Sequence, residues 1–192
     1  LNSPGFFDPV QYLTNGNFWE EFLKRFGGAT EGRVVDLACG TGELRRHITP
    51  QNYFGVDFNP DFISHAQKRF QLPNTRFAVG DITKNKIKGD PDTVFFISAA
   101  HHLDDTQMAL FGRNLKASKV RKFILVDGRP KGILAHPLAF LDAWLGGGKY
   151  FRSPQELMAL VRPHLKIQES GEFSAKLSFY TYPFLVATTI KP

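Results

Sequence analysis

A nine-residue stretch, residues 34–42, most constrains what this chain can fold into. Two β-branched residues lead into Asp36, and the turn that follows consists mostly of small residues. Residues 43–48 then have the pattern of the first turns of a helix. Glycines in such a turn allow backbone angles that other residues avoid, and they let a ligand lie against the main chain. The stretch therefore predicts a strand, a tight ligand-binding loop and a helix.

Further strands repeat this unit along the chain. The first strand falls at about residues 33–38, and the apolar pattern predicts four more at 53–58, 75–79, 93–98 and 122–127. Two final strands, at about 165–173 and 178–190, have no helix between them and must therefore be antiparallel. The pattern predicts an α/β fold, a doubly wound Rossmann-like sheet of five parallel strands closed by an antiparallel C-terminal hairpin.

Helix signals separate most of these strands. Asn59 before Pro60, and Ser153 before Pro154, place a capping residue ahead of a proline at the first helical position. Glu156 completes a capping box with Ser153. The expected helices cover residues 17–26, 59–70, 104–117 and 154–162. Aromatic residues recur at helical spacing in the first of them, so residues 1–31 are expected either to pack on the sheet or to form a helical lid over the ligand.

Composition limits the classes of protein that this chain can belong to. Its 192 residues suffice for a single domain with a full core. The net charge is +6, but the lysines and arginines are scattered, and the densest group, residues 84–88, is short. Cys39 is the single cysteine, which excludes an internal disulfide framework and a cysteine-based zinc site. No secretory signal or membrane-length apolar run is visible, so we expect a cytoplasmic protein; Leu1 leaves open whether the N-terminus is complete.

Three carboxylates end successive strands. Asp57 follows Asp36 by 57 − 36 = 21 residues, and Asp81 ends the third strand. In doubly wound folds an acidic residue after the second strand faces the ribose hydroxyls of a nucleoside. A carboxylate after the third strand can accept from an exocyclic amine, while the N–H of Ile82 can donate to the ring. One such residue could be a helix cap, but three beside a glycine turn predict a nucleoside site.

Four segments resemble the motifs of the class I S-adenosylmethionine-dependent methyltransferases. Residues 35–42 resemble the acidic-x-Gly-x-Gly-x-Gly loop of this family, residues 55–57 its second motif and residues 79–82 its third. Residues 92–103 resemble the fourth motif, in the His-His-Leu variant of small-molecule methyltransferases. Ala38 stands where the family usually has its first glycine. The resemblance covers roughly residues 30–130 by motif and residues 153–192 by pattern, and it implies the fold of that family.

The resemblance also implies the cofactor, S-adenosyl-L-methionine, and the residues that hold it. The loop with Ala38, Gly40 and Gly42 would pack against the methionine part, with Asp36 near its ammonium group. Asp57 would hold the ribose hydroxyls. The other implied contacts are Phe58, Asp81 and Ile82 at the adenine and Ser98 at the methionine end.

The residues after Gly42 disfavour a dinucleotide site. Such a site needs the spacing Gly-x-Gly-x-x-Gly so that a pyrophosphate can approach the helix N-terminus. Here Glu43 and Leu44 follow the loop, the third glycine is absent, and a carboxylate would repel phosphate.

Two histidines follow the fourth strand, next to the expected position of the reactive methyl group. An unperturbed histidine titrates near ~6.5, so His101 or His102 is a candidate catalytic base. The alternative is that one histidine packs the following helix and the other lines the pocket. A metal site could be drawn from His101, Asp104, Asp105 and Asp127, but we favour helix capping by the two adjacent aspartates and expect no metal.

The acceptor is expected to be a small, partly apolar molecule methylated at oxygen or nitrogen. The Asn- or Asp-Pro-Pro-aromatic motif of amino-methylating nucleic-acid enzymes is absent after the fourth strand, and Cys39 lies in the cofactor loop, where it cannot attack a pyrimidine. DNA is therefore not expected and RNA is disfavoured. The alternatives kept are a non-catalytic cofactor-binding scaffold and, behind it, an RNA methyltransferase. Residues 131–152 form an apolar, glycine-containing insertion that is expected to select the substrate, through a packed helix, an apolar channel, or contact with a membrane or lipid-like substrate.

Overall fold

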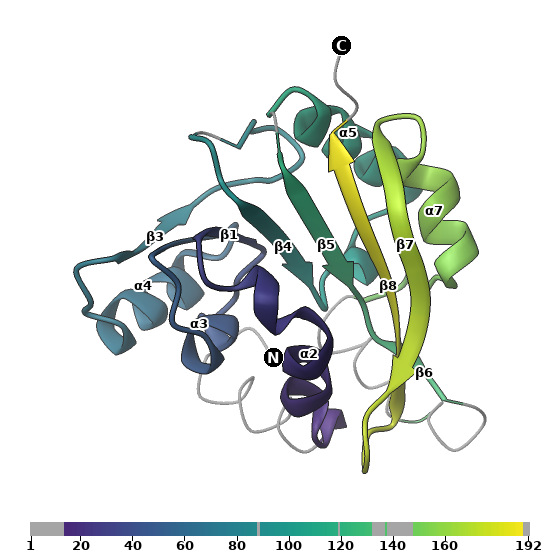
Figure 1. Cartoon of the computed structure of the whole chain (residues 1–192), viewed down its shortest axis with the longest axis horizontal. Helices are drawn as coiled ribbons and strands as arrows, with labels where there is room; N and C mark the ends of the chain where they lie inside the picture. The colour runs from purple at the N-terminus through teal and green to yellow at the C-terminus, as the bar shows by residue number, and fades with distance from the viewer. Residues whose placement is uncertain (1–13, 88, 119, 132–136, 138–147, 190–192) are drawn as a thin grey trace.

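The computed structural model describes residues 14–87, 89–118, 120–131, 137 and 148–189. One mixed sheet runs through this part of the chain, with strand order β3-β2-β1-β4-β5-β8-β6 and β7 paired to β8 (Figure 1). The parallel strands are β1 (Arg33–Leu37), β2 (Asn52–Asp57), β3 (Thr75–Val79), β4 (Thr93–Ile97) and β5 (Lys122–Val126). The predicted five-stranded parallel sheet is confirmed.

The antiparallel part closes the sheet beside β5. Strands β7 (Leu165–Ser174) and β8 (Tyr180–Thr189) form the predicted hairpin, and β8 lies between β7 and β5. A two-residue strand, β6 (Arg129–Pro130), also pairs with β8 and was not predicted. It is too short to carry a periodic pattern, which explains why the sequence does not reveal it.

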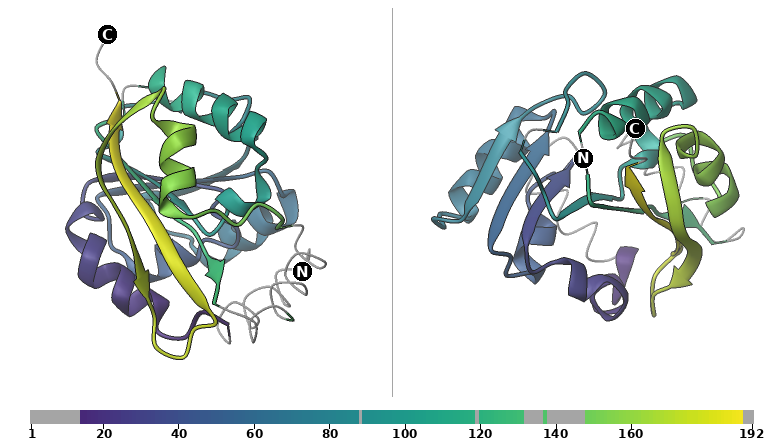
Figure 2. Two further views of the ribbon diagram at one scale, coloured as in Figure 1. Left: turned by 90° about the vertical axis from the view of Figure 1, so that its right-hand side faces the viewer. Right: turned by 45° about the horizontal axis from the view of Figure 1, so that its top comes forward.

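Helices cover both faces of the sheet (Figure 2). On one face lie α2 (Phe18–Phe26), α3 (Glu43–His47) and α4 (Pro60–Arg69), and on the other lie α5 (Asp105–Lys116) and α7 (Pro154–Val161). Strand β4 shows the alternation that feeds the two cores, because Phe95 belongs to the first core while Val94 and Phe96 belong to the second. This strand, predicted at residues 93–98, is therefore buried on both sides, as is typical of a central parallel strand.

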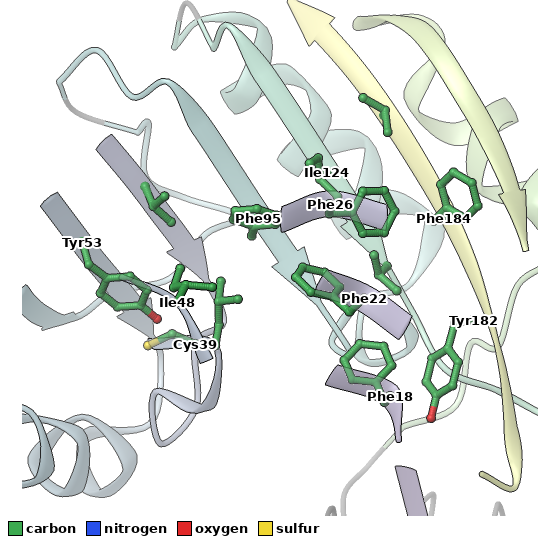
Figure 3. Close-up of a cluster of buried hydrophobic side chains, with 14 of the residues drawn as sticks. Phe18, Phe22, Phe26, Cys39, Ile48, Tyr53, Phe95, Ile124, Tyr182 and Phe184 are labelled. Carbon is green, nitrogen blue, oxygen red and sulfur yellow. The ribbon is translucent and has the colours of Figure 1, made fainter. Parts of the chain in front are cut away.

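The aromatic face of α2 is part of the core (Figure 3). Phe18, Phe22 and Phe26 are buried, and their rings contact those of Tyr182, Phe95 and Phe184 respectively. This helix therefore packs on the sheet along its length. Residues 1–13 lie outside the described residues, so a lid formed by them stays a prediction.

Side-chain caps begin two helices at the predicted positions. Asn59 accepts from the backbone N–H of Asp61 at 2.9 Å, ahead of α4. Ser153 and Glu156 form the reciprocal bonds of a capping box at the start of α7. Both helices are thereby fixed at the end nearer the carboxyl edge of the sheet, where the site is expected.

Most of the 131–152 insertion lies outside the described residues. These include the apolar positions Ile133, Leu134, Leu138, Leu141, Trp144 and Leu145, so the predicted helix or substrate channel stays a prediction. In the described part of the chain, no helix is both long and apolar enough to cross a membrane.

Candidate active site

A cavity of about 370 Å³ lies between the start of α2 and the loop after β1. The loop contributes Ala38, Gly40 and Thr41, and the end of β4 contributes Ile97 and Ser98. The remaining lining residues come from β1 and the loop after it, from the segment before α2 and its first turn, and from α3: Asp36, Cys39, Asn15, Gly16, Asn17, Phe18, Trp19, Glu20, Glu43, Leu44, Arg46 and His47. The cavity therefore opens at the carboxyl edge of the parallel strands, where open α/β sheets bind ligands.

The loop owes its shape to left-handed backbone angles. Gly40 has φ 54° and Gly42 has φ 83°, values that glycine adopts without a steric penalty. A Cβ atom on Gly42 would also approach Phe70 and Phe77 to 3.0 Å. Ala38 also has φ 54°. This alanine therefore adopts the left-handed conformation that a glycine at the same position would adopt without strain. Ala38 thus keeps the shape of the loop, although its backbone is strained.

Asp57 ties the loop to the end of β2. One of its oxygens accepts from the N–H of Gly40 at 2.8 Å, and the other accepts from the N–H of Asn59 at 2.9 Å. Burial raises the pKa of this carboxyl, and the bonds from Asn59 and Gly40 oppose that rise. Asp57 therefore holds the glycine loop and the start of α4 in one arrangement.

Asp36 lies at the wall of the cavity and is only 3% exposed. Its carboxylate accepts from the hydroxyl of Tyr53, on the neighbouring strand β2, at 2.5 Å. Burial raises the pKa of Asp36 to about 7, although the bond from Tyr53 lowers it. The carboxyl of Asp36 therefore gains its negative charge near neutral pH, at the wall of the cavity.

The residues predicted at the adenine lie apart from the cavity. Phe58, directly after β2, is 76% exposed, so its ring is accessible to a ligand. Asp81 accepts from the backbone N–H and hydroxyl of Thr83 and pairs with Lys84 at 3.1 Å, and the Thr83 hydroxyl holds its pKa below the usual range. Ile82 is half-buried and packs against the second core.

The ends of β4 and β5 place a histidine against an aspartate. His101 Nδ1 lies 2.7 Å from Asp127 Oδ1, and both side chains are buried. The His101 ring stacks on that of Phe151, with centroids 5.2 Å apart. The centroid of the His102 ring, which is exposed, lies 4.3 Å from that of His101. Ser98, at φ 51°, donates its N–H to Val126, so the pair stands beside the strand end that also lines the cavity.

Arg152 clamps the segment around this pair and is 7% exposed. It donates to the carbonyl oxygens of Ala100 and Leu103 at 3.2 and 2.8 Å, and to Asp105 at 2.7 Å. Asp104 accepts from the N–H of Gln107 and caps α5. The two aspartates weighed as metal ligands are thus used in capping and in an ion pair, and no metal-binding group of three or more acidic, histidine or cysteine residues occurs among the residues described.

Comparison with known proteins relates this fold to that of methyltransferases. Residues 34–118 match the family model described as a methyltransferase domain. Magnesium protoporphyrin IX methyltransferase from Synechocystis, solved with bound S-adenosylhomocysteine, superposes with a TM-score of 0.69 at 18% identity, covering 98% of this chain and 96% of that one. A methyltransferase from Clostridium acetobutylicum superposes with a TM-score of 0.72 at 14% identity, covering 97% and 98%. The fold is that of the class I S-adenosylmethionine-dependent methyltransferases.

The curated relatives of this chain are methyltransferases, and two of them match it over part of its length. Phthiotriol/phenolphthiotriol dimycocerosates methyltransferase of Mycobacterium leprae is 36% identical over 74 residues, 36% of this chain and 27% of its own length. Trans-aconitate 2-methyltransferase of Mycobacterium ulcerans is 31% identical over 102 residues, 49% of this chain. The chain covers only 37% of that second relative, so it spans well under half the length of either. The predicted class of fold is confirmed, while the His-His-Leu variant stays a prediction.

The methyltransferase fold brings some of the predicted site residues together and separates others. Asp36, Ala38, Gly40 and Ser98 line the cavity. Predicted residues outside its lining are Gly42, Asp57, Phe58, Asp81, Ile82, His101 and His102.

Two partners, Tyr53 and Asp127, were missed by the sequence reasoning in the roles that the structure gives them. Asp127 directly follows β5, much as Asp57 ends β2 and Asp36 lies one residue before the end of β1, and that shared position was a usable signal. Tyr53 gave no such signal, because its bond to Asp36 depends on strand pairing.

Proposed function

We propose that this chain is an S-adenosylmethionine-dependent methyltransferase that acts on an oxygen or nitrogen of a small, partly apolar molecule. One observation carries the proposal. The loop cavity and the buried His101–Asp127 pair lie at the carboxyl ends of neighbouring parallel strands, and Ser98 lines the cavity and donates its N–H to Val126, the residue before Asp127. A methyl donor in the cavity and a base beside it would face the same space.

The cavity fits the methionine end of the cofactor. When bound, the cofactor supplies a methyl group activated by a sulfonium centre. The chain supplies a carboxylate at the wall, Asp36, for an ammonium group, and a loop whose Gly40 lets a ligand lie against the main chain. Asp57 would receive the ribose hydroxyls, and exposed Phe58 would pack on the adenine, near Asp81 and Ile82.

The arrangement of His101 suits a general base. With Nδ1 bonded to the Asp127 carboxylate, the basic nitrogen of the neutral ring is Nε2. Asp127 would also stabilise the imidazolium that forms when His101 takes a proton from a hydroxyl or amine. His102, exposed and in ring contact with His101, is the second candidate and would line the acceptor side.

Two observations favour a small acceptor over RNA. The cofactor cavity carries three carboxylates, Asp36, Glu20 and Glu43, beside Arg46 and His47, so no basic groove for a phosphate backbone begins at the methyl donor. The names of the two mycobacterial relatives also describe small-molecule methylation. A non-catalytic scaffold would need the same cofactor residues, and only an activity measurement separates it from an enzyme.

The test combines cofactor, acceptor panel and a matched pair of variants. The protein is incubated with S-adenosylmethionine and hydroxylated or amine-bearing small molecules, and both S-adenosylhomocysteine and the methylated acceptor are measured by mass spectrometry. We expect at least one acceptor to gain a methyl group, with the rate falling about 100-fold or more in His101→Gln. His65→Gln, on α4, should keep the full rate. Cofactor binding without transfer to any acceptor would favour the scaffold.

A further inference from the structure

Tyr53 occupies a buried position from which it reaches the wall of the cavity. It belongs to β2, is 2% exposed, and its ring packs 5.5 Å from that of Phe77. Its hydroxyl donates to Asp36 at 2.5 Å, and in Figure 3 it points toward the loop at Cys39. Among the described residues, no other hydrogen bond to the Asp36 carboxylate accompanies this one. Tyr53 therefore fixes the orientation of a carboxylate that otherwise faces the cavity.

The pairing of β1 with β2 explains how Tyr53 reaches Asp36. Tyr53 pairs with Val34, and the residue opposite Asp36 is Gly55. A Cβ atom on Gly55 would lie 2.6 Å from Phe77 and 2.8 Å from the sulfur of Cys39, so a side chain there is excluded. The donor must come from two residues earlier on the strand, and a tyrosine has the length to supply it.

Charged and titratable groups surround the pair on several elements. Burial raises the pKa of Tyr53 far above its usual value, so the hydroxyl keeps its proton and remains a donor. Buried Arg45, on α3, partly opposes that rise, and Asp57 raises the pKa of Asp36. The other titratable groups near the pair or at the same cavity are Cys39, Glu20, Glu43, Arg46 and His47.

We infer that Tyr53 is a positioning residue for the cofactor, because its hydroxyl orients the Asp36 carboxylate at the cavity wall and favours the ionised form that an ammonium group requires. The inference rests on the proposed function, since the bound group is the cofactor ammonium. Below neutral pH, Asp36 carries a proton and offers no charge to that group. Binding then expels the proton to solvent, and affinity falls as the pH is lowered.

The experiment measures the affinity of S-adenosylhomocysteine by calorimetry between pH 5.5 and 8.5. For the unaltered chain, affinity should fall by up to about tenfold for each pH unit below about 7. Tyr53→Phe removes a bond to the charged form, so the fall should begin about one unit higher. At pH 7 this variant should bind about fivefold more weakly, and at pH 8.5 nearly as well as the unaltered chain. Asp36→Asn should bind weakly and lose most of the pH dependence.

Tyr182→Phe provides a control, because it also removes a buried phenol, one that is bonded to Ser178 and to Asn15 at the cavity instead of to a carboxylate. Its pH profile should match that of the unaltered chain. An equal loss at every pH in Tyr53→Phe would mean a purely structural role and would overturn the inference, as would a pH-independent affinity in the unaltered chain. Both results leave the proposed function intact. Absence of binding at every pH would instead overturn the proposed function and, with it, the inference.

Discussion

The two halves of the candidate site are built from contacts of different range. At the ends of β1 and β2, Gly40 bonds to Asp57 and Tyr53 bonds to Asp36, and each pair is separated by 17 positions. At the ends of β4 and β5, His101 and Asp127 are 26 positions apart, and Arg152 reaches Ala100 over 52. The first half is contained in one strand–loop–helix–strand unit, whereas the second requires the whole parallel sheet and the segment after the insertion.

The halves also differ in what their carboxylates do. Asp57 is bonded to two backbone N–H groups, and Asp36 to a phenol, so both are held by donors that do not titrate near neutral pH. Asp127 faces an imidazole, which can exchange a proton with a substrate. We propose that the first half binds the cofactor and that the second half takes the proton from the acceptor, and the following predictions separate these roles.

The largest expected effect is on the second half. Asp127→Asn should lower kcat by about as much as His101→Gln does, about 100-fold or more, because the amide no longer stabilises the imidazolium of His101. The affinity for S-adenosylhomocysteine should change less than threefold. Asp90→Asn, on the surface beside Arg121, is the control with unchanged kcat. A variant that loses cofactor affinity instead would show that the two halves are not separate.

The pH dependence of stability reports on the first half. The pKa of Asp36 is about 7 in the folded chain, well above that of an unfolded aspartate. Between these values the folded state binds more protons than the unfolded state, so the free energy of unfolding should fall as the pH rises toward 7. Without cofactor, Asp36 should make the chain about 3 kcal/mol less stable at pH 8 than at pH 4.5. Urea unfolding of the unaltered chain and Asp36→Asn checks this, and the same pH dependence in both would contradict it.

Arg152 tests whether the second half needs its clamp. Replacing it by leucine leaves the carbonyl groups of Ala100 and Leu103 without their donor, which should lower the free energy of unfolding by about 2 kcal/mol. Exposed Arg113→Leu should lower it by less than about 0.5 kcal/mol. Urea unfolding measures both variants. Equal changes in the free energy of unfolding would mean that the guanidinium of Arg152 stabilises the chain no more than that of an exposed arginine does.

The smallest expected effect concerns the loop. Ala38→Gly removes the strain of a left-handed alanine, about 1 kcal/mol, but adds flexibility to the unfolded chain. The net result should be a gain in the free energy of unfolding of about 0.5 kcal/mol. Gly40→Ala should have the opposite sign, because it introduces the same strain. A lower free energy of unfolding in Ala38→Gly would contradict this prediction. It would show that packing of the alanine methyl group stabilises the chain by more than the backbone strain destabilises it.

Sequence reasoning reached the first half of the site more fully than the second. The loop, Asp36 and Asp57 were predicted because their spacing reflects one local unit, and the caps Asn59 and Ser153 are local too. His101 and Asp127 were considered together only as candidate metal ligands, and neither the hydrogen bond between them nor the burial of Arg152 was predicted. They depend on which strands become neighbours and on where the chain returns after 131–152, and no periodic pattern encodes either. The bond from Tyr53 to Asp36 was missed for a related reason, because it follows from the register of β1 with β2.

The most direct test of the cofactor half is the thermal stability of the chain with S-adenosylhomocysteine. At about 100 times its Kd the ligand should add about 2.7 kcal/mol and raise Tm by roughly 5 to 10 °C. Under the same conditions Asp57→Asn should show little increase, while Asp61→Asn, four residues along the chain, should match the unaltered protein. A Tm that does not move in the unaltered chain, or that rises equally in Asp57→Asn, would contradict the account.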